Sequence, residues 1–361
     1  MKRGGLVLLA VAALLGAALG ALFVFRADVA TALFQRMAPQ GVGNVLTARL
    51  PDGLHAVFCG TGSPMPDRRR AGPCTAVIAG ERVFVFDAGE GAAETLSLIG
   101  VSPGRIDTVF LTHLHSDHID GLAPMALQHW GNVSAQAPLQ VVGPTGTARV
   151  AAGLNEGYAI DSTYRVAHHG EQIMPPSGFG LAAREFVIAD GADSVVVHDA
   201  DGVRIIAFQV NHAPVDGAVG YRIEYAGRSI VISGDTSRDD RVIAAARGAD
   251  LLVHEAIDTH LNQIMQNAAN AGGRENVGQI FNDILTYHTS TEDAGRVAQE
   301  AGVGALALTH LLPPTPLPGL DQRFVRAART TFSGPVWAAR DGDVVSLPAS
   351  GGIEHSHQLR F

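Results

Sequence analysis

His113-Leu-His-Ser-Asp-His118 is the stretch that decides the fold of this chain, and it directly follows the apolar run Asp107-Thr-Val-Phe-Leu-Thr112. Four side chains that can bind a divalent metal therefore come directly after a predicted strand. On an extended chain His113 and His115 project to the same side, whereas Asp117 and His118, adjacent at a turn, diverge. One pair can hold one metal and the other pair a second, so the motif predicts a dinuclear metal site.

Further candidate ligands come after later strand-like runs. His212 follows the apolar run 203–210, Asp235 follows 230–234, and His310 follows 305–309. Each run ends in a small residue or a turn before the ligand, so these side chains can converge on one edge of a sheet. The many strand-like runs in the first half, followed by alternating strands and helices, predict two sheets packed face to face with helices outside.

Several different short motifs lie between residues 54 and 345. Beside the His113 motif they are Phe58-Cys-Gly-Thr-Gly62, Asp87-Ala-Gly-Glu-Gly91, Asn211-His212, Gly234-Asp235-Thr236, His254-Glu255-Ala256, His288-Thr-Ser290 and Leu308-Thr-His310. In these motifs the chain resembles the metallo-β-lactamase superfamily, and within it the branch of ribonuclease Z and the zinc-dependent arylsulfatases. The resemblance implies an α/β fold of the four-layer αββα sandwich type.

The same resemblance implies a role for each motif residue. It implies two zinc ions per chain, one held by His113, His115 and His212, the other by Asp117, His118 and His310, with Asp235 as the bridge. Asp87 and Gly89 match a loop that supports the site. Glu255 and His288 match a pair that lies beside the metals, although Glu255 could instead form a buried ion pair and His288 could cap a helix.

The expected chemistry follows from charge. Two Zn²⁺ ions outweigh the carboxylates of Asp117 and Asp235, so the site is locally cationic within a chain whose net charge is -9. Such a site suits an anionic ester, a phosphate or a sulfate, whose developing charge the metals can absorb. We expect Asp117 to orient the attacking water, and His288, steered by Glu255, to protonate the leaving oxygen. The predicted catalytic residues are therefore Asp117, His288 and Glu255.

The N-terminus predicts a membrane segment. Lys2 and Arg3 precede the apolar run 6–25, which is long enough to cross a bilayer and longer than the core of a typical secretory signal. The charges before it place the rest of the chain outside the cytoplasm. We expect a membrane anchor and linker over 1–40, a metallo-hydrolase domain over 41–348 and a C-terminal tail over 349–361, with the catalytic domain periplasmic. The alternative is a cleaved signal and a secreted protein.

The substrate prediction rests on a missing feature. A ribonuclease Z-type enzyme needs a basic arm to grip tRNA, expected between the His113 motif and His212. Residues 144–190 contain only Arg149, Arg165 and Arg184 and no Lys, and we interpret 156–190 as an insertion or lid loop. Few basic residues and a negative net charge give little attraction for nucleic acid.

These features together favour a dinuclear zinc hydrolase that acts on a small anionic ester, either an aryl sulfate or a phosphodiester. A nucleic-acid partner is not expected, the membrane is contacted through the N-terminal helix, and a homodimer is left open by analogy with the fold. The alternative is a ribonuclease Z-type endonuclease that processes the 3′ end of tRNA. A non-catalytic protein with a structural metal is disfavoured, because it would not need Glu255 and His288.

The chain has two cysteines, Cys59 and Cys74, which excludes a disulfide scaffold and a zinc-thiolate site. A disulfide between them would close a short loop and contribute about 3 kcal/mol on an entropic model. We favour the alternative that Cys59 is an unpaired buried residue within a strand.

Overall fold

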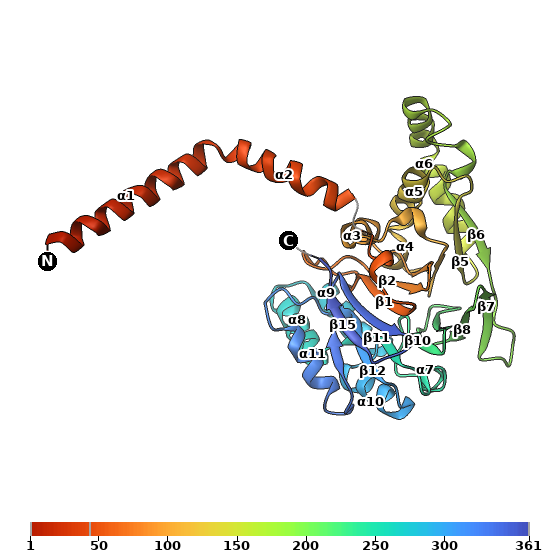
Figure 1. Ribbon diagram of the computed structural model, residues 1–361. Helices are drawn as coiled ribbons and strands as arrows, with labels where there is room; N and C mark the ends of the chain where they lie inside the picture. The colour runs from red at the N-terminus through yellow and green to blue at the C-terminus, as the bar shows by residue number, and fades with distance from the viewer. Residues whose placement is uncertain (1, 43–44, 360–361) are drawn as a thin grey trace. The chain divides into compact units, whose positions relative to one another are not determined.

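The computed structural model describes residues 2–42 and 45–359 and divides into two compact units (Figure 1). The N-terminal unit, which extends to Val45, contains α1 (Lys2–Val24) and α2 (Arg26–Val42). The second unit begins at Leu46 and contains the sheets and the predicted ligands. Each unit is described by itself.

The predicted transmembrane helix is wrong. Across residues 2–42 and 45–359, no helix combines the length and the apolar character that crossing a membrane requires. The apolar run does form a helix, α1. The membrane partner and the extracytoplasmic location, anchored or secreted, were inferred from this run and are corrected with it.

Two sheets form the centre of the second unit. In spatial order, the first sheet contains β15 (Glu354–His357), β14 (Asp343–Pro348), β1 (Gly53–Gly60), β2 (Cys74–Ala79), β3 (Arg82–Phe86), β4 (Thr108–Phe110), β5 (Leu139–Gly143) and β6 (Leu181–Glu185). The second contains β13 (Val336–Ala338), β12 (Ala305–Leu312), β11 (Leu251–Ile257), β10 (Arg228–Ile232), β9 (Val219–Tyr225), β8 (Val203–Gln209) and β7 (Ser194–Ala200). The strands β3 to β6 are parallel, and so are β10 to β13.

The two sheets pack face to face. Residues of both sheets, among them Phe58, Phe110 and Tyr221, form one buried apolar cluster. Because β1 and β11 are buried along their whole length, they consist of nearly continuous apolar runs. The predicted arrangement of two sheets with helices outside is present (Figure 1).

Helices cover the outer face of each sheet. Those that pack on the first sheet are α3 (Ala92–Ile99), α5 (Leu122–Val133) and α6 (Thr147–His169). Those that pack on the second are α7 (Asp240–Ala246), α10 (Thr291–Ala301) and α11 (Asp321–Ala328). The remaining α-helices of the unit are α4 (Ser116–Ile119), α8 (Thr259–Ala271) and α9 (Glu275–Asp283). The result is four layers, helices on each outside and two sheets between them.

The lid-loop interpretation of 156–190 is wrong for its first half, where α6 continues to His169. Most of this part of α6 is exposed, including Ile160 and Tyr164. It therefore lacks the apolar periodicity by which an amphipathic helix is found in a sequence.

Cys59 and Cys74 form a disulfide, contrary to our expectation that Cys59 is unpaired. The antiparallel pairing of β1 with β2 explains the link, because Gly60 lies opposite Cys74 at a bulge that follows Phe58. This register brings the two cysteine Cα atoms to 5.0 Å, within the range that a disulfide spans.

Candidate functional site

The predicted ligands lie at one edge of the two sheets. His113, His115, Asp117 and His118 follow β4, in the turn that leads into α4 and in α4 itself. His212 follows β8 and Asp235 follows β10. Because β4 and β10 both end at this edge, residues more than a hundred positions apart in the sequence come together.

His310 lies inside β12 rather than after it. It is the unpaired residue of a bulge, since Glu255 pairs with Thr309 and Ala256 with Leu311. Its φ of 46° is in the left-handed region. A bulge redirects a side chain away from the alternation of its strand, which is how His310 comes to lie beside Asp117.

Six of the seven predicted ligands form two clusters of three. In the first, His115 Nδ1 lies 2.9 Å from His113 Nε2 and 3.3 Å from His212 Nε2. In the second, Asp117 Oδ2 lies 3.5 Å from the Nε2 of His118 and 3.4 Å from the Nε2 of His310. The predicted division into two groups of three residues matches these two clusters.

Asp235 lies between the two clusters. Its Oδ2 atom is 3.9 Å from His113 Nε2 and 4.0 Å from His212 Nε2. On the other side it is 3.3 Å from His118 Nε2 and 3.2 Å from His310 Nε2. A single carboxylate oxygen thus faces histidine nitrogens of both clusters, as a bridging ligand requires.

The residues fit divalent metal ions. Asp117 Oδ2, His118 Nε2 and His310 Nε2 are buried and lack a hydrogen-bond partner within the described part of the chain. Buried polar atoms are otherwise almost always paired. Imidazole nitrogen and carboxylate oxygen are common ligands of zinc. The site therefore contains His and Asp clusters that can hold metal ions.

Asp87 fixes the orientation of the His113–His118 turn. Its Oδ1 accepts the Thr112 N–H at 2.8 Å, and its Oδ2 accepts the Thr112 hydroxyl and His118 Nδ1, each at 2.8 Å. With Nδ1 as the donor, the His118 ring leaves Nε2 free to face Asp117 and Asp235. The sequence predicted Asp87 to lie in a loop that supports the site, and in the structure Asp87 contacts Thr112 and His118.

Gly89 and Gly121 support the same turn through direct backbone contacts. A Cβ atom on Gly89 would collide with the carbonyl oxygen of Asp117, and one on Gly121 would collide with the carbonyl oxygen of Gly89. Only glycine allows the two backbones to approach this closely.

Burial and the shared carboxylate set the electrostatics. Burial holds the pKa of His113 well below its usual value. For His118 burial acts in the same direction, but the carboxylates of Asp235 and Asp87 outweigh it and raise the pKa well above normal. Burial opposes ionisation of Asp235, yet the surrounding histidines, His310 first, hold its pKa well below the usual range. The carboxylate is thus kept in the charged form that a cation needs.

Glu255 and His288 lie beside the clusters. His288 Nδ1 is 3.1 Å from Glu255 Oε1, which also accepts the backbone N–H groups of Thr289 at 2.9 Å and Thr236 at 3.2 Å. The His288 ring lies 5.4 Å from that of His310, centre to centre. The alternative role as a helix cap does not apply, because Ser290 caps α10.

Tyr287 was missed by the sequence analysis. Its carbonyl oxygen lies 3.0 Å from His212 Nδ1, so it orients that ring for binding through Nε2. Because the contact uses the backbone, no side-chain pattern in the sequence could have indicated it.

A hollow of about 580 Å³ adjoins Asp117. Its walls include Ser116 and Asp120 on one side and Arg68 and Arg70 on the other. The volume lies in the range of small-molecule sites. Substrate can therefore reach Asp117 from this side.

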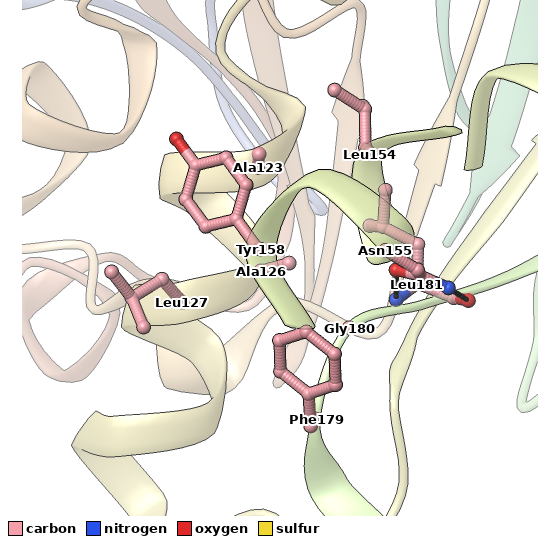
Figure 2. A pocket seen from close by; sticks show the side chains of 9 residues that line it. All are labelled: Ala123, Ala126, Leu127, Leu154, Asn155, Tyr158, Phe179, Gly180 and Leu181. Atoms are coloured by element: carbon pink, nitrogen blue, oxygen red, sulfur yellow. Dashed lines mark hydrogen bonds between the residues drawn. The ribbon is translucent and has the colours of Figure 1, made fainter. Parts of the chain in front are cut away.

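A second hollow has no connection with this chemistry. It lies between α5, α6 and residues 179–181 and has a volume of about 10 Å³ (Figure 2). Asn155 hydrogen-bonds both the N–H and the C=O of Leu181, at 2.8 and 2.9 Å, at its edge. Because this space is hardly larger than one water molecule, it is a packing gap.

Known proteins of similar sequence agree with this geometry. Residues 67–272 match the Metallo-beta-lactamase superfamily. A ribonuclease Z of Mycobacterium bovis (strain BCG / Pasteur 1173P2) is 37% identical over 291 residues, which cover 80% of this chain and 96% of that protein. A ribonuclease Z of Mycobacterium sp. (strain KMS) is 36% identical over 280 residues, 77% of this chain and 91% of that protein.

Solved structures show the same fold. The short form of human tRNase Z has a TM-score of 0.57 with 22% identity, covering 81% of this chain and 99% of that chain. The metallo-beta-lactamase fold protein YhfI of Bacillus subtilis has a TM-score of 0.55 with 22% identity and the same coverage.

The relatives overturn two predictions, the small-molecule arylsulfatase or phosphodiesterase reaction and the exclusion of nucleic acid. Both depended on the scarcity of basic residues in 144–190 and on the predicted membrane anchor, but a basic residue near the site can come from another segment, here Arg68. The alternative, a ribonuclease Z-type enzyme, agrees better with these relatives. This chain belongs to the ribonuclease Z family of the metallo-beta-lactamase superfamily and is a metal-dependent hydrolase of ester bonds.

Proposed function

We propose that this chain is a ribonuclease Z-type endonuclease that uses two zinc ions to hydrolyse a phosphodiester bond at the 3′ end of precursor tRNA. The observation that carries the proposal is the position of Asp235, whose carboxylate faces both ligand clusters. Two ions that share a carboxylate suit the in-line displacement of a phosphodiester. The identity with ribonuclease Z proteins supports an RNA substrate, and tRNA is the one we propose.

The proposed ligands are those of the two clusters with Asp235 between them: His113, His115 and His212 for one ion, and Asp117, His118 and His310 for the other. When bound, the two ions supply an activated water and absorb the negative charge that develops on the phosphoryl oxygens. Asp117 borders the hollow, where its carboxylate can accept a hydrogen bond from the attacking water and orient it.

His288 is the proposed general acid. Its Nδ1–H donates to Glu255 Oε1, and a second proton can be carried on Nε2. The second proton, on Nε2, can then pass to the leaving ribose oxygen. The backbone N–H groups of Thr236 and Thr289 hold Glu255 in place, so the pair has a defined orientation.

The substrate phosphate approaches through the hollow beside Asp117. Arg68 and Arg70 line this hollow, and Arg68 is exposed. A guanidinium group binds phosphate oxygens in a planar fork. The exposed Arg68 therefore offers the RNA backbone a cationic contact.

The test compares substrates and one variant. The zinc-loaded chain is assayed on precursor tRNA, an aryl sulfate, an aryl phosphodiester and a β-lactam, and we expect cleavage of the tRNA at its 3′ side. His288→Ala should lower kcat on tRNA by about 10²–10⁴-fold, the usual contribution of a general acid, and spare the aryl ester, whose leaving group needs no proton. His129→Ala, at a histidine distant from the ligands, is the matched control.

Two results would contradict the proposed function or the proposed role of His288. If the zinc-loaded chain does not cleave precursor tRNA, the proposed function is wrong. If His288→Ala keeps its zinc but loses activity equally on tRNA and on the aryl ester, His288 is not the acid.

A further inference from the structure

A cavity of about 560 Å³ lies apart from the predicted ligands, on the segment Arg68–Arg70. Its walls come from four parts of the chain that are distant in sequence: this segment, residues 315–321, Arg340 and Asp341 before β14, and His357 and Leu359 near the end of the described residues. Arg68 and Arg70 also line the hollow beside Asp117. The arginine segment therefore borders both spaces.

The two acidic residues of the cavity are already engaged. Asp321 is bound by Arg340, whose Nε lies 3.1 Å from Oδ2. Asp341 accepts the N–H and the hydroxyl of Thr61 at 3.0 and 2.7 Å. These carboxylates hold the walls together and are not free to neutralise another cation.

Arg70 is also part of the wall. Its Nη1 donates to the Thr61 hydroxyl at 2.6 Å and to the Ala339 carbonyl at 2.5 Å. Because it is largely buried, its pKa is lowered, although Asp341 opposes this effect. Arg70 thus fixes the base of the segment and leaves its other two arginines at the surface.

The positive charges available to a ligand are those of Arg68 and Arg69. Both are exposed, and among residues 2–42 and 45–359 neither guanidinium group forms a hydrogen bond or an ion pair. The Arg69 N–H donates to Asp67 Oδ1 at 2.9 Å, which fixes the turn that presents both side chains. Four arginines against two carboxylates leave the cavity positive within a chain of net charge -9.

We propose that this cavity binds the phosphate groups of a ligand, at a site separate from the metal centre. Guanidinium groups match the tetrahedral oxygens of phosphate through paired N–H donors. The cavity volume is in the range that holds a ligand of nucleotide size. Leu359 and His357 supply an apolar and a polar wall for the rest of that ligand.

The test measures binding of inorganic pyrophosphate to the zinc-loaded chain by calorimetry. Arg69 is the informative position because it lines this cavity and not the hollow beside Asp117. Arg69→Glu should weaken binding by about tenfold or more, as expected when a charged hydrogen-bond donor is replaced by a like charge of the ligand. Arg149→Glu makes the same change at an exposed arginine outside the cavity and should leave the affinity unchanged. Zinc content is measured in all three proteins, so that chelation is recognised.

Kinetics identify the source of the phosphate. If it belongs to the RNA backbone, Arg69→Glu raises KM for precursor tRNA and pyrophosphate competes with the RNA. If it belongs to a free metabolite, KM is unchanged while pyrophosphate binding is lost. Either result supports the site, whereas equal affinity of Arg69→Glu and Arg149→Glu for pyrophosphate overturns it. The binding measurement does not depend on tRNA cleavage, so the proposed function can fail without affecting this result.

Discussion

Replacement of Asp87 by Asn tests whether this residue orients the metal-binding turn. Asp87 is 5% exposed and adopts a left-handed φ of 59°, a conformation that Asn also tolerates. The amide keeps one acceptor oxygen, which can still receive the Thr112 N–H. Its NH₂ group would then face His118 Nδ1 and donate to it, so the imidazole proton would move to Nε2. A protonated Nε2 cannot bind a metal.

The expected effect is a loss of zinc affinity of about 10–100-fold, the usual cost of losing the partner of a metal-binding histidine. This corresponds to about 1.4–2.7 kcal/mol. Affinity is measured by competition with a chromophoric chelator. Asp107→Asn is the matched control, because its carboxylate also accepts a backbone N–H, that of Val83 at 2.7 Å, but contacts no predicted ligand. Equal zinc affinity of Asp87→Asn and the control would refute the reasoning.

Two further predictions concern stability. His55 is fully buried, and burial lowers its pKa below the ordinary 6.5 despite its hydrogen bond to the Pro51 carbonyl. Below pH 6.5 the unfolded state therefore binds more protons than the folded state, and the free energy of unfolding falls as the pH drops. His55→Gln should reduce that loss in urea unfolding measured above and below pH 6.5, and an unchanged pH dependence would count against this assignment. Tyr221→Phe removes the hydroxyl that donates to the Leu111 carbonyl at 2.6 Å and should cost about 1–3 kcal/mol, because the buried acceptor is left unpaired. A urea midpoint equal to that of the wild type would show that the bond contributes nothing.

The convergence of most of the predicted ligands could be expected from the sequence because these residues have local signals. The His113 motif and the strands before His212 and Asp235 are short patterns whose convergence follows from the geometry of parallel strands. The bulge that places His310 is different, since it depends on the register of β12 against β11. The same holds for the link between Cys59 and Cys74, which the register of two neighbouring strands determines.

The errors arose where composition was used in place of contacts. An apolar run at the N-terminus predicted a membrane helix that the described residues do not contain. A scarcity of basic residues in 144–190 was read as an absence of RNA binding, although exposed arginines also lie in another segment, at Arg68 and Arg69, and Arg68 borders the hollow beside Asp117. Net charge and residue counts report averages, whereas a phosphate meets only the groups within a few ångströms of it.

The backbone contacts of Gly89 and Gly121 have a consequence for how this site can evolve. They hold the metal-binding turn through main-chain atoms, so the exposed Ser116 side chain is not needed to shape it. Ser116 is exposed at the hollow and can vary without moving its neighbours. A library that randomises Ser116 and the arginine segment should therefore yield enzymes with altered substrate preference and intact zinc binding, whereas one that includes the two glycines should yield mostly inactive chains.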